Sequence, residues 1–114
     1  MRQSVLVVEE SWHVANAMKS YLESLGMVVS MAGKLEHAER LTAEQTSELV
    51  LVDINLRDET TYELLERLKP QGVPVIALSA YPVAQASAPS AAAFLQKPYS
   101  GRGLLAALTK VFSR

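Results

Sequence analysis

Five short apolar runs recur along the amino-acid sequence, and they restrict the possible folds more than any other feature. The runs are VLVV (5–8), MVVSMA (27–32), LVLV (49–52), VPVIAL (73–78) and AAAFL (91–95). Most of them are continuous rather than alternating, which is typical of strands that are buried on both faces of a parallel sheet. The sequence therefore predicts five buried, parallel strands.

Segments with helical periodicity separate these runs. They carry apolar residues three or four positions apart and cover residues 12–25, 35–45, 61–69 and 101–113. Gly26 is expected to end the first helix and Ser100 to cap the last one, while Thr60 and Glu63 have the spacing of a capping box. This alternation of strands and helices predicts an α/β fold with helices on both faces of the sheet.

The connection at residues 80–92 is the irregular one. It contains Pro82 and Pro89 among alanines and serines, so we expect only a short or irregular fourth helix there, since proline interrupts a helix. For the chain as a whole we expect a flavodoxin-like three-layer sandwich. Its five-stranded parallel sheet would have the strand order 2-1-3-4-5.

Length and composition exclude several classes of protein. With 114 residues, 49% hydrophobic and 20% charged, the chain is expected to form a single domain over residues 1–114. A net charge of −1 argues against a nucleic-acid partner, which would need a basic excess. The absence of cysteine excludes disulfides and thiolate metal sites. No stretch has the length of a membrane span or the pattern of a signal peptide, so we expect a cytoplasmic location and no membrane partner.

Polar side chains follow the apolar runs, at the points where the predicted strands end. Glu9 and Glu10 follow the first run, Asp53 the third, Ser79 the fourth, and Lys97 comes two residues after the fifth. The carboxyl ends of parallel strands meet at one edge of a sheet, where ligands bind. Singly, each residue is explained as well by a turn, a helix cap or a solvated charge. Together they predict a site.

Neighbouring carboxylates repel one another unless a cation intervenes. Mg²⁺ is bound by oxygen ligands and works with one or two carboxylates plus phosphate oxygens. A lysine and a hydroxyl beside such a site suit a phosphoryl group, so Asp53 is the candidate nucleophile that forms an acyl phosphate, with Lys97 and Mg²⁺ neutralising the transferred oxygens.

Four stretches resemble the receiver domain of bacterial two-component response regulators, the family of the chemotaxis regulator. They are VLVVEE (5–10), LVLVDINL (49–56), VPVIALSAY (73–81) and FLQKPY (94–99). The resemblance covers nearly the whole chain. It implies a phosphorelay switch that takes a phosphoryl group from a sensor histidine kinase or a phosphotransfer protein. Such a switch turns over its own aspartyl phosphate but is not an enzyme acting on a pool of substrate.

The resemblance also implies roles for single residues. Asp53 would be the phosphoacceptor, and Glu9 and Glu10 would be the acidic pair that binds the metal. Asn55 would offer its backbone carbonyl to the same ion.

On the opposite side of the site, the resemblance makes Ser79 the switch hydroxyl and Phe94 the switch aromatic. Lys97 would pair with the phosphoryl group, and the Lys97–Pro98 peptide bond would be cis. A downstream partner is expected to bind through residues 80–113, while the oligomeric state is not indicated.

The sequence departs from the family pattern at three places. The second acidic residue is Glu10 instead of Asp, and Arg57 and Thr61 stand where most receivers have proline and glycine. Fewer residues separate Ser79 from Lys97 than is usual in the family. In this respect the chain resembles a subgroup of stand-alone receivers with an unusual fourth helix. These departures leave open a pseudo-receiver, an interaction module with a weakened or lost site. A third alternative, a phosphohydrolase of the haloacid-dehalogenase type, would need an acid at position 55. The residue there is Asn55, which argues against this alternative.

Overall fold

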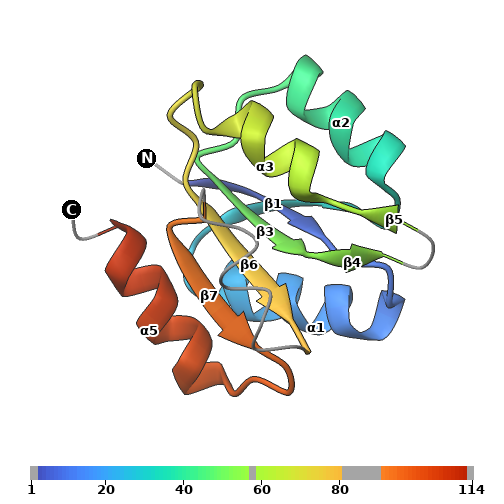
Figure 1. Cartoon of the computed structure of the whole chain (residues 1–114). Coiled ribbons are helices and arrows are strands. Elements are labelled where there is room, and N and C mark those ends of the chain that lie inside the picture. Colours follow the sequence, from blue (N-terminus) through green and yellow to red (C-terminus); the bar gives the residue numbers. More distant parts are fainter. Residues whose placement is uncertain (1–2, 57–58, 81–90, 113–114) are drawn as a thin grey trace.

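The computed structural model describes residues 3–56, 59–80 and 91–112. The strands are β1 (Ser4–Val8), β2 (Val28–Ala32), β3 (Leu49–Asp53), β4 (Asn55–Leu56), β5 (Glu59–Thr60), β6 (Val75–Ser79) and β7 (Ala93–Gln96). The helices are α1 (Trp12–Ser24), α2 (Leu35–Glu44), α3 (Tyr62–Leu68) and α5 (Gly101–Phe112). Strands and helices alternate as predicted except at two places (Figure 1): β4 and β5 stand between β3 and α3, and most of the connection between β6 and β7 lies outside the described residues.

The described residues form a five-stranded sheet of order β2-β1-β3-β6-β7, in which every pairing is parallel. This is the predicted flavodoxin-like order 2-1-3-4-5, which is therefore confirmed. The register aligns the carboxyl ends of neighbouring strands: Asp53 on β3 pairs with Leu78, and Ser79 on β6 pairs with Gln96. The polar residues at these strand ends consequently lie along one edge.

Helices α2 and α3 cover one face of the sheet, and α1 and α5 cover the other (Figure 1). Strand side chains alternate between two buried clusters: Leu6 and Val8 pack on the α2/α3 side, while Val5 and Val7 pack on the α1/α5 side. Both faces of each central strand are thus buried. This explains why the apolar runs in the sequence are continuous.

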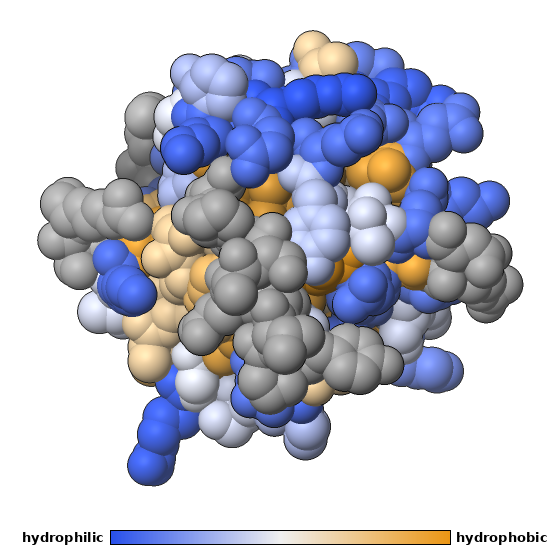
Figure 2. Space-filling view, viewed as in Figure 1, coloured by the Kyte–Doolittle hydropathy of each residue, from blue (hydrophilic) through white to orange (hydrophobic). Residues whose placement is uncertain are grey.

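Hydrophilic residues cover the outer surface of α2 and α3 in Figure 2. Apolar side chains of these helices point inward instead; Leu64, Leu65 and Leu68 of α3 are buried against the sheet. None of the helices in the described ranges is long and apolar enough to cross a membrane.

Two helix ends follow the sequence prediction. Gly26, with φ +88°, comes directly after the α1 C-cap residue Leu25, and its N–H donates to the carbonyl of Glu23. A positive φ costs glycine little, which suits the end of a helix. At the start of α5, the hydroxyl of Ser100 accepts a hydrogen bond from Gly103 N at 3.0 Å.

The predicted capping box at α3 is wrong. The N-cap residue is Thr61, and within the described structure its side chain makes no capping bond to the helix. Thr60 lies in β5, which pairs antiparallel with β4 as a small two-stranded sheet. This hairpin could not be predicted from the sequence, because two-residue strands are too short to show a periodic pattern. Most of the expected irregular fourth helix falls on residues 81–90, which lie outside the described residues.

Adjacent leucines on α5 allow a test of the core. Leu104 is 1% exposed and Leu105 is 46% exposed. Replacing Leu104 by alanine should lower the free energy of unfolding by about 2–5 kcal/mol, because it leaves a cavity against the sheet. The same change at Leu105 should cost about 0.5 kcal/mol or less. Urea denaturation of both variants measures the difference, and equal losses would contradict the placement of this helix.

Candidate functional site

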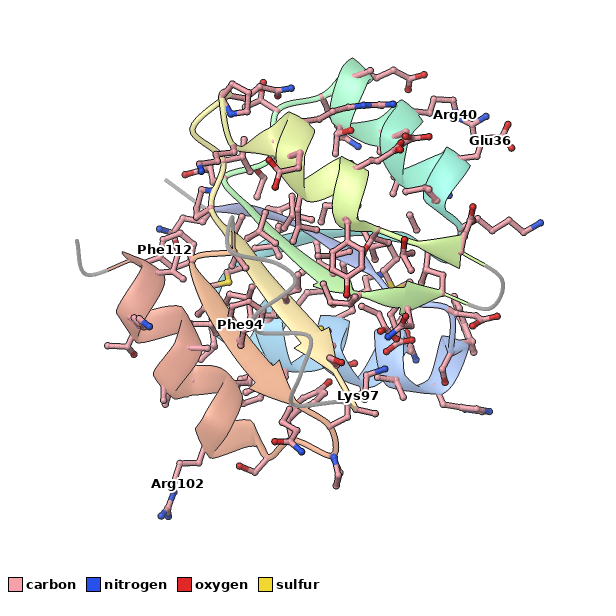
Figure 3. The ribbon with its side chains drawn as sticks, in the orientation of Figure 1. Glu36, Arg40, Phe94, Lys97, Arg102 and Phe112 are labelled. Atoms are coloured by element: carbon pink, nitrogen blue, oxygen red, sulfur yellow. The ribbon has the colours of Figure 1, made fainter. Side chains whose placement is uncertain are left out.

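Three charged side chains meet at the carboxyl edge of the sheet. The ammonium Nζ of Lys97 lies 2.7 Å from Oε1 of Glu9 and 2.7 Å from Oδ2 of Asp53. The two acids are almost fully buried, at 4% and 8% exposure, whereas about a quarter of the Lys97 side chain is exposed. Figure 3 shows Lys97 just beyond the ends of β6 and β7. One partly exposed cation therefore offsets part of the negative charge of the two buried acids.

Backbone amides hold the remaining carboxylate oxygens. Oε2 of Glu9 accepts a hydrogen bond from Ser11 N at 3.1 Å, and Oδ1 of Asp53 accepts one from Asn55 N at 3.0 Å. Each carboxylate is therefore fixed by the lysine on one oxygen and by the chain on the other. Every such oxygen can accept a second bond, so the oxygens retain capacity to bind a cation.

Burial raises the pKa of Asp53 above its ordinary value, and the charge of Glu9 adds to this rise, while Lys97 and the N–H of Asn55 oppose it. Burial alone would lower the pKa of Lys97, but its bonds and charge attraction to Asp53 and Glu9 outweigh burial and raise it. The lysine therefore keeps its proton at neutral pH. It remains available as a fixed positive charge beside Asp53.

Ser79 and Phe94 lie on the two strands next to this cluster. Ser79 is buried at the end of β6, and its carbonyl accepts a hydrogen bond from Lys97 N at 2.8 Å. Phe94 pairs with Ala77, is half-buried and packs against the α3 side of the core (Figure 3). The Lys97–Pro98 peptide bond is cis, as the resemblance implied.

The second acid, Glu10, is exposed directly after buried Glu9. Within the described ranges, no three acidic or histidine side chains converge closely enough to hold a metal ion. Glu9 and Asp53 thus share the lysine. Asn55, whose backbone carbonyl is the other expected ligand, is also exposed.

A cavity of about 650 Å³ opens beside Lys97, between the first half of α1 and the segment after β7. Its wall is mostly apolar, and besides Lys97 it is lined by His13, Val14, Ala17, Ala80, Pro98 and Tyr99. Trp12, which begins α1, is 64% exposed. The charged cluster therefore adjoins an apolar surface.

A family model described as the response regulator receiver domain matches residues 5–109. The chain belongs to this family. Receiver domains are signalling domains of two-component systems, so the resemblance noted in the sequence is confirmed. No sequence among the curated proteins compared matches the chain.

Solved receiver structures superimpose closely on this one. The receiver domain of the Francisella response regulator 1452 has 23% sequence identity and a TM-score of 0.87, over 99% of this chain and 98% of that one. Vibrio cholerae CheY4, a chemotaxis response regulator, has 20% identity and a TM-score of 0.86, over 98% and 100%. Thermotoga maritima TrrA, solved in complex with Mg²⁺ and BeF, has 20% identity and a TM-score of 0.88, over 96% and 99%. At these identities the likeness concerns the fold.

The donor atoms of this receiver site fit a hard divalent cation. Glu9 and Asp53 supply carboxylate oxygens at one edge of the sheet. Mg²⁺ is commonly held by one or two carboxylates together with waters. The chemistry of the two carboxylates is therefore compatible with that ion.

Thr61 is a site neighbour that the sequence analysis did not identify as one. Its hydroxyl donates to the backbone carbonyl of Asp53 at 2.9 Å, and its side chain is fully buried. The signal was present as a departure from the family pattern, a threonine where glycine is usual. Only the structure connects that departure to Asp53.

Lys97→Met tests the charge balance of the cluster. Removing the ammonium leaves the buried carboxylates of Glu9 and Asp53 without this donor, so the free energy of unfolding at pH 7 should fall by about 1–3 kcal/mol. The loss should be smaller in an Asp53→Asn background, where one of the two charges is already absent. Urea denaturation of the double-mutant cycle measures this coupling.

A matched control is Lys110→Met on α5, where the side chain is exposed and the effect should stay within about 0.5 kcal/mol. If Lys97→Met costs the same in both backgrounds, the lysine stabilises the fold through packing rather than through these charges.

Proposed function

We propose that this receiver domain is a phosphorelay switch that accepts a phosphoryl group on Asp53. The donor would be the phosphohistidine of a sensor histidine kinase or a phosphotransfer protein. The observation that carries this proposal is the contact of Lys97 with Asp53 at the carboxyl edge of the sheet, beside buried Glu9. The domain would phosphorylate and dephosphorylate itself, without turning over a separate substrate.

In the transfer step, a carboxylate oxygen of Asp53 attacks the phosphorus of the donor. The new P–O bond forms as the P–N bond to the donor imidazole breaks, and the imidazole leaves with the electron pair. Lys97 Nζ, already 2.7 Å from Oδ2, can pair with the phosphoryl oxygens and offset their charge. The N–H of Asn55 keeps the carboxylate in one orientation through Oδ1. The site therefore supplies position and charge, which this chemistry mainly requires.

Glu9, Asp53 and the carbonyl of Asn55 would hold Mg²⁺, with Glu10 contributing directly or through a water. The ion would supply additional positive charge at the phosphoryl oxygens. The side chain of Glu10 is one methylene longer than that of aspartate, so its direct coordination would differ from the family pattern.

The switch would run through Ser79 and Phe94. A phosphoryl group on Asp53 would draw the hydroxyl of Ser79 toward it by a charge-assisted hydrogen bond. Phe94 lies on the next strand and packs into the α3 side of the core, so it could fill space that Ser79 leaves. A downstream protein would then read the surface of residues 80–113, of which 81–90 lie outside the described residues.

A pseudo-receiver is the second candidate, and exposed Glu10 is the observation that favours it. In that case Lys97 would stay bonded to Glu9 and Asp53, and the domain would act as a constitutive interaction module. Under either candidate we place the chain in the cytoplasm, with residues 1–114 forming one unit.

Phosphorylation at Asp53 is tested by intact-mass analysis after incubation with acetyl phosphate and Mg²⁺. The wild-type chain should gain the mass of one phosphoryl group, because Asp53 is the proposed acceptor and lies beside Lys97, which can offset the charge of the transferred oxygens. Asp53→Asn should gain none, whereas Glu63→Gln, at an exposed carboxylate on α3, should react like wild type. Labelling of Asp53→Asn would move the acceptor to another residue, and no labelling of wild type would favour the pseudo-receiver.

Binding of Mg²⁺ is tested with Trp12, the one tryptophan of the sequence, which lies two residues after Glu10. Adding Mg²⁺ should change its fluorescence, and Glu10→Gln should weaken the apparent affinity by about tenfold or more. The control is Glu23→Gln at the other end of α1, which should bind like wild type. Wild-type affinity in Glu10→Gln would mean that Glu9 and Asp53 hold the ion without Glu10.

A further inference from the structure

We propose that Thr61 is a positioning residue for Asp53, and that its hydroxyl orients the carboxylate for phosphoryl transfer. This inference rests on the proposed function of Asp53 as the phosphoacceptor. It concerns a residue that touches neither the phosphoryl group nor a metal, but the backbone that carries the acceptor.

Thr61 occupies the N-cap position of α3, where a threonine side chain would ordinarily bond the first turn of the helix. Within the described residues it makes no such bond, and its Oγ1 points back to β3 instead. There it donates to the carbonyl of Asp53 at 2.9 Å and lies 3.3 Å from the carbonyl of Ile54. The side chain is 0% exposed, so water does not compete for this donor.

The two carbonyls belong to the two peptide groups that follow Asp53. A peptide group is planar and rigid, so fixing its oxygen also fixes the direction of its N–H. The oxygen of the peptide between Ile54 and Asn55 accepts a hydrogen bond from the backbone N–H of Thr61 at 3.0 Å. The single proton of the Thr61 hydroxyl is shared between this oxygen, at 3.3 Å, and the carbonyl of Asp53. The N–H of the same peptide, at Asn55, is the group that donates to Oδ1 of Asp53 at 3.0 Å. Thr61 therefore holds one end of the peptide whose other end holds the carboxylate.

The preceding peptide is held in the same way. Its oxygen, at Asp53, accepts from the Thr61 hydroxyl, and its N–H, at Ile54, donates to the carbonyl of Leu78 on β6 at 2.9 Å. The backbone from Asp53 to Asn55 is thus tied to the neighbouring strand on one side and to Thr61 on the other.

The β4–β5 hairpin brings Thr61 into this position. Asn55 pairs with Thr60, and Leu56 pairs with Glu59, so the chain reverses within a few residues and returns beside Asp53. Glu59 anchors the returning strand, because its Oε1 accepts a hydrogen bond from Leu35 N, at the start of α2, at 3.4 Å. The hairpin thereby places the buried hydroxyl of Thr61 next to the backbone carbonyl of Asp53.

A buried threonine needs a hydrogen-bond partner in any case, so the geometry is also compatible with a role in folding alone. The two roles differ in what the hydroxyl controls. A folding role predicts that its loss lowers stability and leaves the reactivity of the folded protein unchanged. A positioning role predicts slower phosphorylation in protein that is fully folded.

The test compares Thr61→Val, which removes the hydroxyl at nearly constant shape, with Thr61→Ser, which keeps it. Both are phosphorylated with acetyl phosphate and saturating Mg²⁺, in urea-free buffer where circular dichroism confirms folding. The valine variant should react about tenfold more slowly than wild type, and the serine variant within about threefold of it. Thr60→Val, at the exposed neighbouring position, should react like wild type. Amide exchange at Asn55 should be faster in Thr61→Val and unchanged in Thr60→Val.

Equal rates for wild type and folded Thr61→Val would overturn this inference and leave the proposed function standing. A wild-type chain that acetyl phosphate does not label would overturn both. If Thr61→Val does not fold, Thr61→Ala takes its place, and a rate equal to that of Thr61→Ser would again overturn the positioning role.

Discussion

The ammonium group of Lys97, held between the carboxylates of Glu9 and Asp53, is the interaction on which the functional edge of the molecule depends. The lysine comes from a position 88 residues away from Glu9 and 44 residues away from Asp53. The parallel order β2-β1-β3-β6-β7 brings the carboxyl ends of these strands to one edge. Two nearly buried carboxylates would repel each other strongly without a cation between them. The contact of Lys97 with these two carboxylates therefore links the topology of the sheet to the chemistry at its edge.

The same pairing describes a resting arrangement. Lys97 is bonded to Oδ2 of Asp53, so under the proposed function transfer would require the ammonium to pass from the carboxylate to the phosphoryl oxygens. A phosphorylated aspartate carries more negative charge than a carboxylate, which strengthens its attraction for the lysine. Under the proposed function, the Lys97 ammonium would thus move toward the phosphoryl oxygens as negative charge accumulates on them. Phosphorylation would also release part of its hold on Glu9.

Much of this arrangement could be predicted from the sequence, since it follows from strong local patterns. The continuous apolar runs predicted the strands, and the residues after them predicted which side chains would share the edge. Helix ends at Gly26 and Ser100 were also predictable, because their residue types have narrow conformational roles. Each of these inferences uses residues that are close in sequence, or a topology rule that applies to all such sheets.

The features that were missed depend on contacts between elements. The spacing of Thr60 and Glu63 suggested a capping box, but β5 pairs with β4 and takes Thr60 out of the helix. Tertiary pairing overrode the local motif. The start of α2 shows the same effect, because its N-cap residue Lys34 provides no side-chain bond within the described structure and Glu59 from β5 bonds Leu35 N instead. Neither of these two contacts can be predicted from residues that are close together in the sequence.

The two oxygens of Asp53 are held by different kinds of contact, and this difference fits the chemistry proposed for them. Oδ2 is bonded by Lys97, a flexible and partly exposed side chain that can exchange one anionic partner for another. Oδ1 is bonded by the N–H of Asn55, a backbone group whose peptide is fixed from its far side by Thr61. An acceptor needs both properties: one oxygen free to change partners during transfer, and one that keeps the carboxylate aimed while it does so. Lys97 supplies the exchangeable contact to Oδ2. The β4–β5 hairpin supplies the fixed one, because it places the buried Thr61 beside the backbone of β3.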